Sequence, residues 1–191
     1  PNNEHDLSGQ VALVTGATAG LGERFARVLA SAGAHVVVTA RRVDRLEALA
    51  AEINEAGGKA TPIALDVSDA ESIASVVAEA TETCGPVQIL VNNAGVVDAK
   101  RAHKMDVDLV DHVLGVNLRG PYLMSIEVAK RLIATETPGR IVNISSIGAF
   151  NYGGHGAALY SITKAGVVRM TEALAVEWAR NHINVNAIAP G

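Results

Sequence analysis

The chain has 191 residues, which is enough for one hydrophobic core and short for two. Hydrophobic residues make up 49% and charged residues 19%, and the formal net charge of −4 with 3% aromatics argues against a nucleic-acid surface. No apolar run approaches the ~18 residues that a membrane span needs, and no signal peptide is expected. The lone Cys84 rules out a disulfide framework and favours a reducing, cytoplasmic location.

Strand and helix patterns alternate along the chain. Runs rich in Val, Ile and Leu predict strands at 10–15, 35–39, 60–65, 88–91, 140–144 and 183–189. Helical patterns lie between them at 20–32, 43–56, 69–83, 106–118, 121–135 and 159–181. Near-continuous hydrophobicity is typical of strands buried on both faces. We therefore expect a single α/β domain over residues 1–191, a three-layer, Rossmann-type doubly wound parallel sheet whose ligands bind at the carboxyl ends of the strands.

A glycine-rich turn follows the first predicted strand, in the spacing Gly16-x-x-x-Gly20-x-Gly22. Glycines let the backbone turn tightly and approach a pyrophosphate closely, while the free N–H groups of the next helix face the anion. The flanking strands and helix supply the context that a dinucleotide-binding turn requires, and an ordinary turn of small residues is the alternative. The residues expected to contact the cofactor are Gly16, Thr18, Ala19, Gly20, Leu21 and Gly22.

The end of the second strand indicates the cofactor. Enzymes that use NAD place a carboxylate there to bind the ribose hydroxyls, whereas this chain reads Ala40-Arg41-Arg42. Guanidinium groups bind a 2′-phosphate through charge-assisted hydrogen bonds. The pair Arg41 and Arg42 therefore favours NADP(H), with NAD(H) as the alternative if both arginines only begin a solvated helix.

Tyr160 and Lys164 lie four residues apart, so one face of a helix would carry both side chains. A phenol ordinarily ionises only near pH ~10, and a neighbouring positive charge favours its phenolate form. Such a phenol can exchange a proton with an alcohol oxygen. Ser146 lies upstream at the end of the fifth strand, and Ser145 beside it is a competing candidate. By itself, the pair is more typical of a solvated helix face.

The ordered motifs resemble those of the short-chain dehydrogenase/reductase family. They are Thr15-Gly16-x-x-x-Gly20-x-Gly22, Asn92-Asn-Ala-Gly95, Asn117, Ser146, Tyr160-x-x-x-Lys164 and Pro190-Gly191, and the match runs from about Gly9 to the last residue. The resemblance implies a catalytic set in which Tyr160 is the general acid/base. Lys164 would bind the nicotinamide ribose and favour the phenolate, Ser146 would hold the substrate oxygen, and Asn117 would hold a relay water near the lysine.

The resemblance also extends the expected cofactor site. Asp66 and Val67 would meet the adenine, Asn93, Ala94 and Gly95 would line the adenine ribose, and Pro190 and Gly191 would sit against the nicotinamide. The implied enzyme transfers a hydride between NADP(H) and a carbonyl or secondary alcohol, either as a 3-oxoacyl-thioester reductase or as a polyol or secondary-alcohol dehydrogenase. A catalytically idle NAD(P)-binding sensor on the same fold is the alternative. The histidines show no ligand spacing, so no metal is expected, but His155 lies between Ser146 and Tyr160 and could touch substrate.

Two features concern assembly and extent. The segments 121–135 and 159–179 carry apolar residues around most of their circumference, and a helix of that kind is buried on every side. Relatives pair these helices across a dyad, which implies a homodimer or homotetramer. The family normally continues past Pro190-Gly191 into a substrate-covering segment and one more strand, so that segment is expected to be missing here and the substrate cannot be read.

Overall fold

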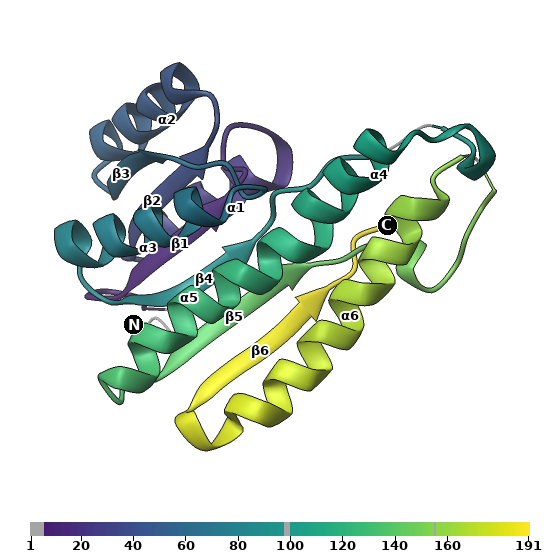
Figure 1. Ribbon diagram of the computed structural model, residues 1–191. Coiled ribbons are helices and arrows are strands. Elements are labelled where there is room, and N and C mark those ends of the chain that lie inside the picture. The colour runs from purple at the N-terminus through teal and green to yellow at the C-terminus, as the bar shows by residue number, and fades with distance from the viewer. Residues whose placement is uncertain (1–5, 98–99, 155) are drawn as a thin grey trace.

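A computed structural model describes residues 6–97, 100–154 and 156–191 of the chain. In this part, six parallel strands form one sheet in the order β3-β2-β1-β4-β5-β6 (Figure 1). The strands are β1 (Val11–Thr15), β2 (His35–Ala40), β3 (Lys59–Ala64), β4 (Val87–Asn92), β5 (Gly139–Ile144) and β6 (Ile183–Ile188). The α-helices are α1 (Gly20–Ser31), α2 (Val43–Glu55), α3 (Ala70–Cys84), α4 (Val107–Leu114), α5 (Gly120–Ala134) and α6 (Ala158–Trp178).

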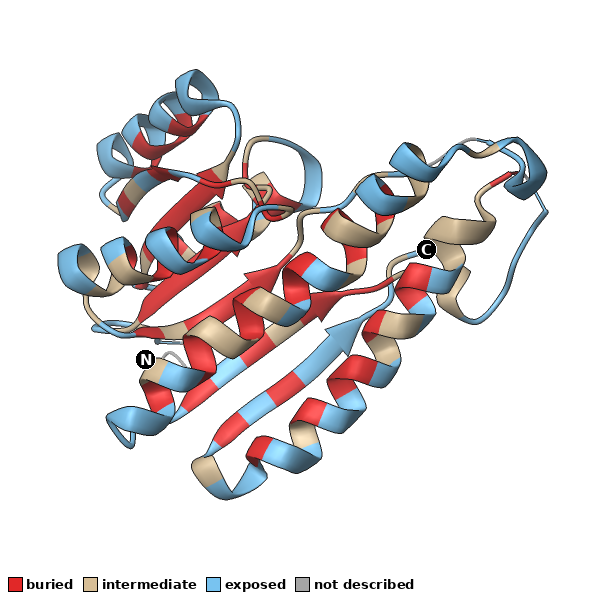
Figure 2. Ribbon diagram, in the orientation of Figure 1, coloured by how far each residue is buried: buried red, intermediate tan, exposed pale blue. Residues whose placement is uncertain are grey.

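Helices cover both faces of the sheet. One core packs α1 and α2 against the first strands through buried side chains such as Ala26, Leu46 and Ile53. The other core packs α3, α5 and α6 against the opposite face through side chains such as Ile73 and Met124. The central strands β1, β2 and β4 are almost entirely buried, whereas the edge strands β3 and β6 also carry exposed residues (Figure 2). The predicted three-layer, doubly wound fold is confirmed.

The structure differs from the prediction between residues 106 and 135. Instead of two separate helices, α4 runs into a π-helical segment, η2 (Gly115–Arg119), which continues directly into α5. Pro121, which lacks an N–H, lies at the start of α5 directly after the π-helical segment. The wider π turn keeps the chain helical through residues 119–120, the gap between the two predicted helices.

The position of β1 and β4 fixes the place of the ligand site. The chain winds outward from β1 through β2 to β3, returns through α3, and pairs β4 with the other side of β1. Loops that leave β1 and β4 therefore diverge above the carboxyl ends of the central strands, which is where open α/β sheets bind ligands. In the described part of the chain, no helix combines the length and the apolar character needed to cross a bilayer.

Candidate active site

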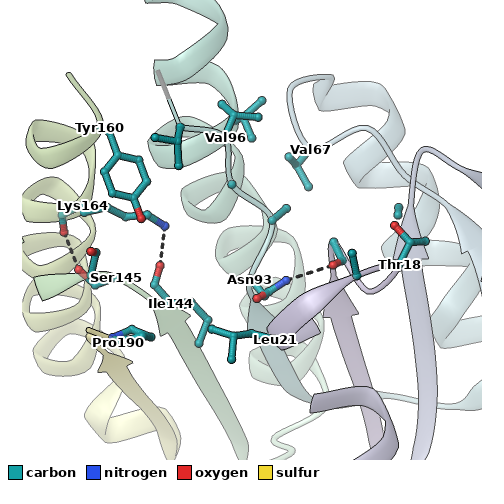
Figure 3. Close-up of a pocket in the computed structure, with 18 of the residues that line it drawn as sticks. Thr18, Leu21, Val67, Asn93, Val96, Ile144, Ser145, Tyr160, Lys164 and Pro190 are labelled. Carbon is teal, nitrogen blue, oxygen red and sulfur yellow. Dashed lines mark hydrogen bonds between the residues drawn. The ribbon is translucent and has the colours of Figure 1, made fainter. Parts of the chain in front are cut away.

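A cavity of about 640 Å³ opens at the carboxyl ends of the strands. Its lining includes the predicted residues Gly16, Thr18, Ala19, Leu21, Arg41, Arg42, Asp66, Val67, Asn93, Ala94, Gly95, Ser146, Tyr160, Lys164, Pro190 and Gly191. The volume lies within the usual range for ligand pockets. Figure 3 shows the side chains of Tyr160 and Lys164 on one side of this space and the turn that carries Thr18 on the other.

Gly16 and Gly22 allow close backbone contacts that a side chain would prevent. Gly16 has φ +66°, and a Cβ there would lie 2.9 Å from the Cα atom of Ala94. A Cβ at Gly22 would lie 2.3 Å from the carbonyl oxygen of Gly16. The α1 N-terminus and the loop after β4 are therefore held against the turn, although neither Gly20 nor Gly22 lines the cavity.

Thr15 joins this turn to the loop that follows β4. Its buried hydroxyl accepts hydrogen bonds from the backbone N–H groups of Asn93 and Ala94, both at 3.0 Å. The side-chain amide of Asn93 donates in return to the carbonyl oxygens of Thr15 and Gly16 (Figure 3). We did not predict a role for the Thr15 side chain, because a polar residue at the end of a strand is usually a simple terminus.

Charged side chains gather at the β2 and β3 end of the cavity. Arg42 donates from Nη2 to the hydroxyl of Thr18 at 2.8 Å, so this guanidinium is held across the glycine turn. Asp66 accepts from both the hydroxyl and the backbone N–H of Ser68, and these bonds hold the pKa of its carboxyl below the ordinary value. Arg41 lines the same end of the cavity and adds a smaller electrostatic contribution in the same direction.

Asn117 lies behind the cavity lining, in the π-helical segment. Its buried side chain accepts from the N–H of Val96 and donates to the carbonyl of the same residue, each at 2.8 Å. The amide also donates to the hydroxyl of Thr163 at 3.3 Å. Asn117 thus fixes the loop after β4 against α6, directly beside the predicted catalytic residues.

The first turns of α6 carry Tyr160 and Lys164 on one face. The ammonium nitrogen of Lys164 lies 5.6 Å from the centroid of the Tyr160 ring. It donates to the carbonyl of Ile144 at the end of β5, at 2.7 Å (Figure 3). Lys164 is buried, and the loss of hydration lowers its pKa from 10.5 to about 8.

The two adjacent serines have different surroundings. Ser145 is buried and its hydroxyl donates to the backbone carbonyl of Lys164 at 2.9 Å. The hydroxyl oxygen of Ser146 accepts from the N–H of Gly148 at 3.1 Å, and Ser146 is half-buried in the cavity lining beside Tyr160. Ser145 therefore braces α6 against β5, while Ser146 faces the open space.

The cavity also contains residues that the sequence did not single out. Together with Ser145, the lining is completed by Ala40, Leu65, Val96, Val97, Val116 and Ile144. The six apolar residues lie at strand ends, in loops and, for Val116, in the π-helical segment, and only their position in the fold distinguishes them from core residues. His155, which was expected to be able to touch substrate, lies outside the described residues.

Residues 10–191 match the short chain dehydrogenase family. The chain belongs to this family. The chain is 41% identical over 189 residues to the 3-oxoacyl-(acyl-carrier-protein) reductase FabG of Aquifex aeolicus, covering 98% of this chain and 75% of that protein. It is 37% identical over 189 residues to the 2-dehydro-3-deoxy-D-gluconate 5-dehydrogenase of Dickeya dadantii, covering 99% of this chain and 74% of the relative.

Solved structures of short-chain dehydrogenases share the fold. A metagenomic short-chain oxidoreductase in complex with NADP has a TM-score of 0.92 at 40% identity, covering 97% of this chain and 84% of the other. A short-chain dehydrogenase/reductase from Mycobacterium marinum has a TM-score of 0.95 at 34% identity, covering 98% of this chain and 76% of the other. The present chain is accordingly an NAD(P)-dependent oxidoreductase of this family.

Proposed function

We propose that this short-chain dehydrogenase interconverts a carbonyl compound and a secondary alcohol with NADP(H), and that Tyr160 is its general acid/base. The observation that carries the proposal is one shared cavity. Ser146, Tyr160 and Lys164 line one end, and the glycine turn with Arg41 and Arg42 lines the other. A dinucleotide needs an anion-binding turn and a reacting group at opposite ends of its site, and the cavity supplies both.

The residues of the chain provide orientation and a proton. When bound, the nicotinamide ring supplies or accepts the hydride. Tyr160 gives a proton to the carbonyl oxygen in reduction and takes it back in oxidation. Ser146 donates a hydrogen bond to the same oxygen, since the bond that it accepts from the N–H of Gly148 does not use its O–H proton. The ammonium of Lys164, 5.6 Å from the centroid of the Tyr160 ring, would bind the nicotinamide ribose beside the reacting groups.

The surroundings of the two serines support Ser146 over Ser145 as the catalytic serine. Ser145 donates its hydroxyl proton to the carbonyl of Lys164, which leaves none for a substrate. Asn117 is proposed to act beside the lysine, and its bonds to both backbone groups of Val96 show that it at least holds the loop in place.

NADP(H) is the proposed cofactor, with NAD(H) as the weaker alternative. The end of β2 carries Ala40 where an NAD-selective site has a carboxylate, and the guanidinium of Arg42 is already held beside the glycine turn by Thr18. Asp66 and Val67 would meet the adenine, and Pro190 and Gly191 the nicotinamide. A relative at 40% identity contains bound NADP.

The named relatives leave two substrate classes. One reduces a 3-oxoacyl thioester and the other oxidises a sugar acid, while a catalytically idle sensor finds no support among them. The deciding experiment is a panel of ketones and alcohols, assayed by the absorbance of the reduced nicotinamide. Turnover with NADPH is expected for at least one ketone. Tight binding of NADPH without any turnover would favour the idle sensor instead.

A homodimer or homotetramer through α5 and α6 is part of the proposal. The structure gives α6 one buried face and an outward side that exposes Ile162 and Val176 among the charged residues Arg169 and Glu172. This outward side is more mixed than the sequence suggested, yet it keeps large apolar side chains in water. A cytoplasmic location and a separate substrate segment stay predictions. The chain spans about three quarters of the length of the curated relatives that it matches.

A further inference from the structure

A buried chain of hydrogen bonds lies next to the catalytic end of the cavity. Asn92 and Asn143 are partners in the β4–β5 register, and each directly precedes a residue of the cavity lining. The amide nitrogen of Asn92 donates to the side-chain oxygen of Asn143 at 2.8 Å and to the hydroxyl of Ser125 on α5 at 3.0 Å. The amide nitrogen of Asn143 donates to the hydroxyl of Thr171 on α6 at 2.9 Å. The chain therefore joins two neighbouring strands to the two helices that cover this face of the sheet (Figure 1).

Backbone carbonyls at its two ends determine the direction of this chain. Thr171 donates its hydroxyl proton to the carbonyl of Val167 at 2.7 Å, so toward Asn143 it can only accept. Asn143 must therefore present its nitrogen to Thr171 and its oxygen to Asn92. Asn92 in turn presents its nitrogen, which also donates to the carbonyl of Pro121 at 3.3 Å. Only one arrangement satisfies these bonds, and it requires β4, β5, α5 and α6 to be in register.

Polar side chains are an unfavourable choice for stabilising this core. The side chains of Asn92, Ser125, Asn143 and Thr171 are all more than nine-tenths buried. Among the described residues, the Oδ1 atom of Asn92 has no hydrogen-bond partner. Buried amides add little net stability when they are bonded and lower it when they are not, so apolar side chains of similar shape would serve at least as well. The chain therefore points to a geometric role.

The segments that the chain joins carry the groups of the proposed reaction. The residue after Asn143 is Ile144, whose carbonyl accepts from the ammonium of Lys164. Thr171 lies about two turns after Lys164 on α6, so both side chains bond β5 from the same side of the helix. The residues after Asn92 form the loop that lines the cofactor side of the cavity.

We propose that Asn143 is a positioning residue of the reaction. It sets the place of α6, and with it Tyr160 and Lys164, relative to the loop after β4. This inference rests on the proposed function. Asn143 acts at a distance, because it is fully buried and lies outside the cavity lining. A misplacement of about 1 Å by a change far from the chemistry can lower a rate about 10²-fold.

Asn143→Leu tests the proposal, because it removes both hydrogen bonds of the amide with little change in shape. No donor is left without an acceptor, since the Asn92 amide keeps Ser125 and Pro121 and the Thr171 hydroxyl still donates within α6. With the fastest ketone of the panel, turnover per bound NADPH should fall about tenfold or more. The dissociation constant of NADPH should stay within about twofold, and the urea midpoint should not fall.

Asn54→Leu is the matched control. The Asn54 amide also uses both ends, since it donates to the carbonyl of Ala60 and accepts from the N–H of Ala60, and it lies outside the cavity lining. Its loss takes a partner from a backbone N–H, so the urea midpoint should fall while turnover per bound NADPH stays unchanged. A merely structural role of Asn143 would give this same pattern in Asn143→Leu.

A second pair of variants tests the chain from α6. Thr171→Ser keeps the hydroxyl that accepts from Asn143, so turnover per bound NADPH should stay within about twofold of the parent. Thr171→Val removes that acceptor, and turnover per bound NADPH should fall about fivefold or more. This pair decides the matter alone if Asn143→Leu does not fold.

The outcomes separate this inference from the proposed function. Turnover of Asn143→Leu within about threefold of the parent would overturn the inference alone. Equal turnover in Thr171→Ser and Thr171→Val would overturn it as well. No NADPH oxidation by the parent with any ketone would overturn the proposed function and this inference with it.

Discussion

The Tyr160 hydroxyl is the single group on which the proposed chemistry depends. Tyr160→Phe removes the proton donor and keeps the ring that faces Lys164, so cofactor affinity should stay close to that of the parent. Turnover should fall about 10²–10⁴-fold, which is the usual contribution of general acid/base catalysis. Steady-state rates and NADPH titration check both parts. Turnover within threefold of the parent would remove Tyr160 from the mechanism.

Burial of Lys164 should be visible in the stability of the protein. The folded pKa of about 8 lies below the ordinary 10.5, so the unfolded chain binds the additional proton between these two values. The destabilisation caused by burying the charged Lys164 is therefore fully present below pH 8, and it disappears as the pH rises toward 10.5. Relative to Lys164→Met, the free energy of unfolding of the parent should rise by up to about 3 kcal/mol over that range. Urea unfolding of both proteins at several pH values measures this rise. A difference in unfolding free energy that stays constant with pH would contradict the prediction.

Cofactor selection should depend on the arginines at the end of β2. Each charge-assisted hydrogen bond contributes about 1.5–3 kcal/mol, so we expect about tenfold or greater preference for NADPH over NADH. The double variant Ala40→Asp, Arg41→Ala removes one phosphate ligand and adds an acceptor for ribose hydroxyls, which should reverse the preference. Arg45→Ala, at an exposed position of α2, is the control. Equal dissociation constants of the two cofactors for the parent would show that neither arginine binds the 2′-phosphate.

At the scale of elements, the hydrogen bonds that Thr15 of β1 accepts from the loop after β4 can be tested with a matched pair of threonine variants. Thr15 and Thr39 are partners in the β1–β2 register, and both are buried. The Thr15 hydroxyl accepts from two backbone N–H groups, whereas the described bond of the Thr39 hydroxyl is a donation to the carbonyl of Val14. Thr15→Val should therefore cost about 1–3 kcal/mol of stability and weaken NADPH binding.

Thr39→Val should cost less and leave the cofactor affinity unchanged, because no backbone N–H depends on its hydroxyl in the described structure. Chemical denaturation and cofactor titration of the two variants give the comparison. Equal effects in the two variants would show that Thr15 contributes only as a buried strand residue.

The central strands β1, β2 and β4 were predictable because they are buried on both faces, so that their sequences are apolar runs. The predicted 35–39, for example, became His35–Ala40. The π-helical turn at Gly115–Arg119 was not predictable, since it has no periodicity of its own in the sequence. The shared helix face of Tyr160 and Lys164 followed from their spacing. The hydrogen bond from Arg42 to Thr18 joins two loops that only the folded sheet brings together, so it could not be predicted.

At the scale of the whole molecule, the outward side of α6 should mediate association between copies. Val176 is 81% exposed there. Val176→Asp would place a charge in the proposed interface and should shift the protein toward monomers. Val28→Asp, on α1 at the opposite face of the sheet, should leave the oligomeric state unchanged. Sedimentation velocity distinguishes them, and a monomeric parent or an unaffected Val176→Asp variant would contradict the interface.

The pairing of β1 with both β2 and β4 has a consequence for how the chain is made. The ribosome releases β1, β2 and β3 well before β4, so the first three strands can pair while the other edge of β1 still lacks its neighbour. That edge belongs to the most apolar strand of the finished sheet, whose residues Val11–Thr15 are all buried. A nascent chain with this unpaired, hydrophobic strand edge can pair with other nascent chains and aggregate. Delivery of Val87–Asn92 closes the edge and, in the same event, brings the two halves of the cofactor site together.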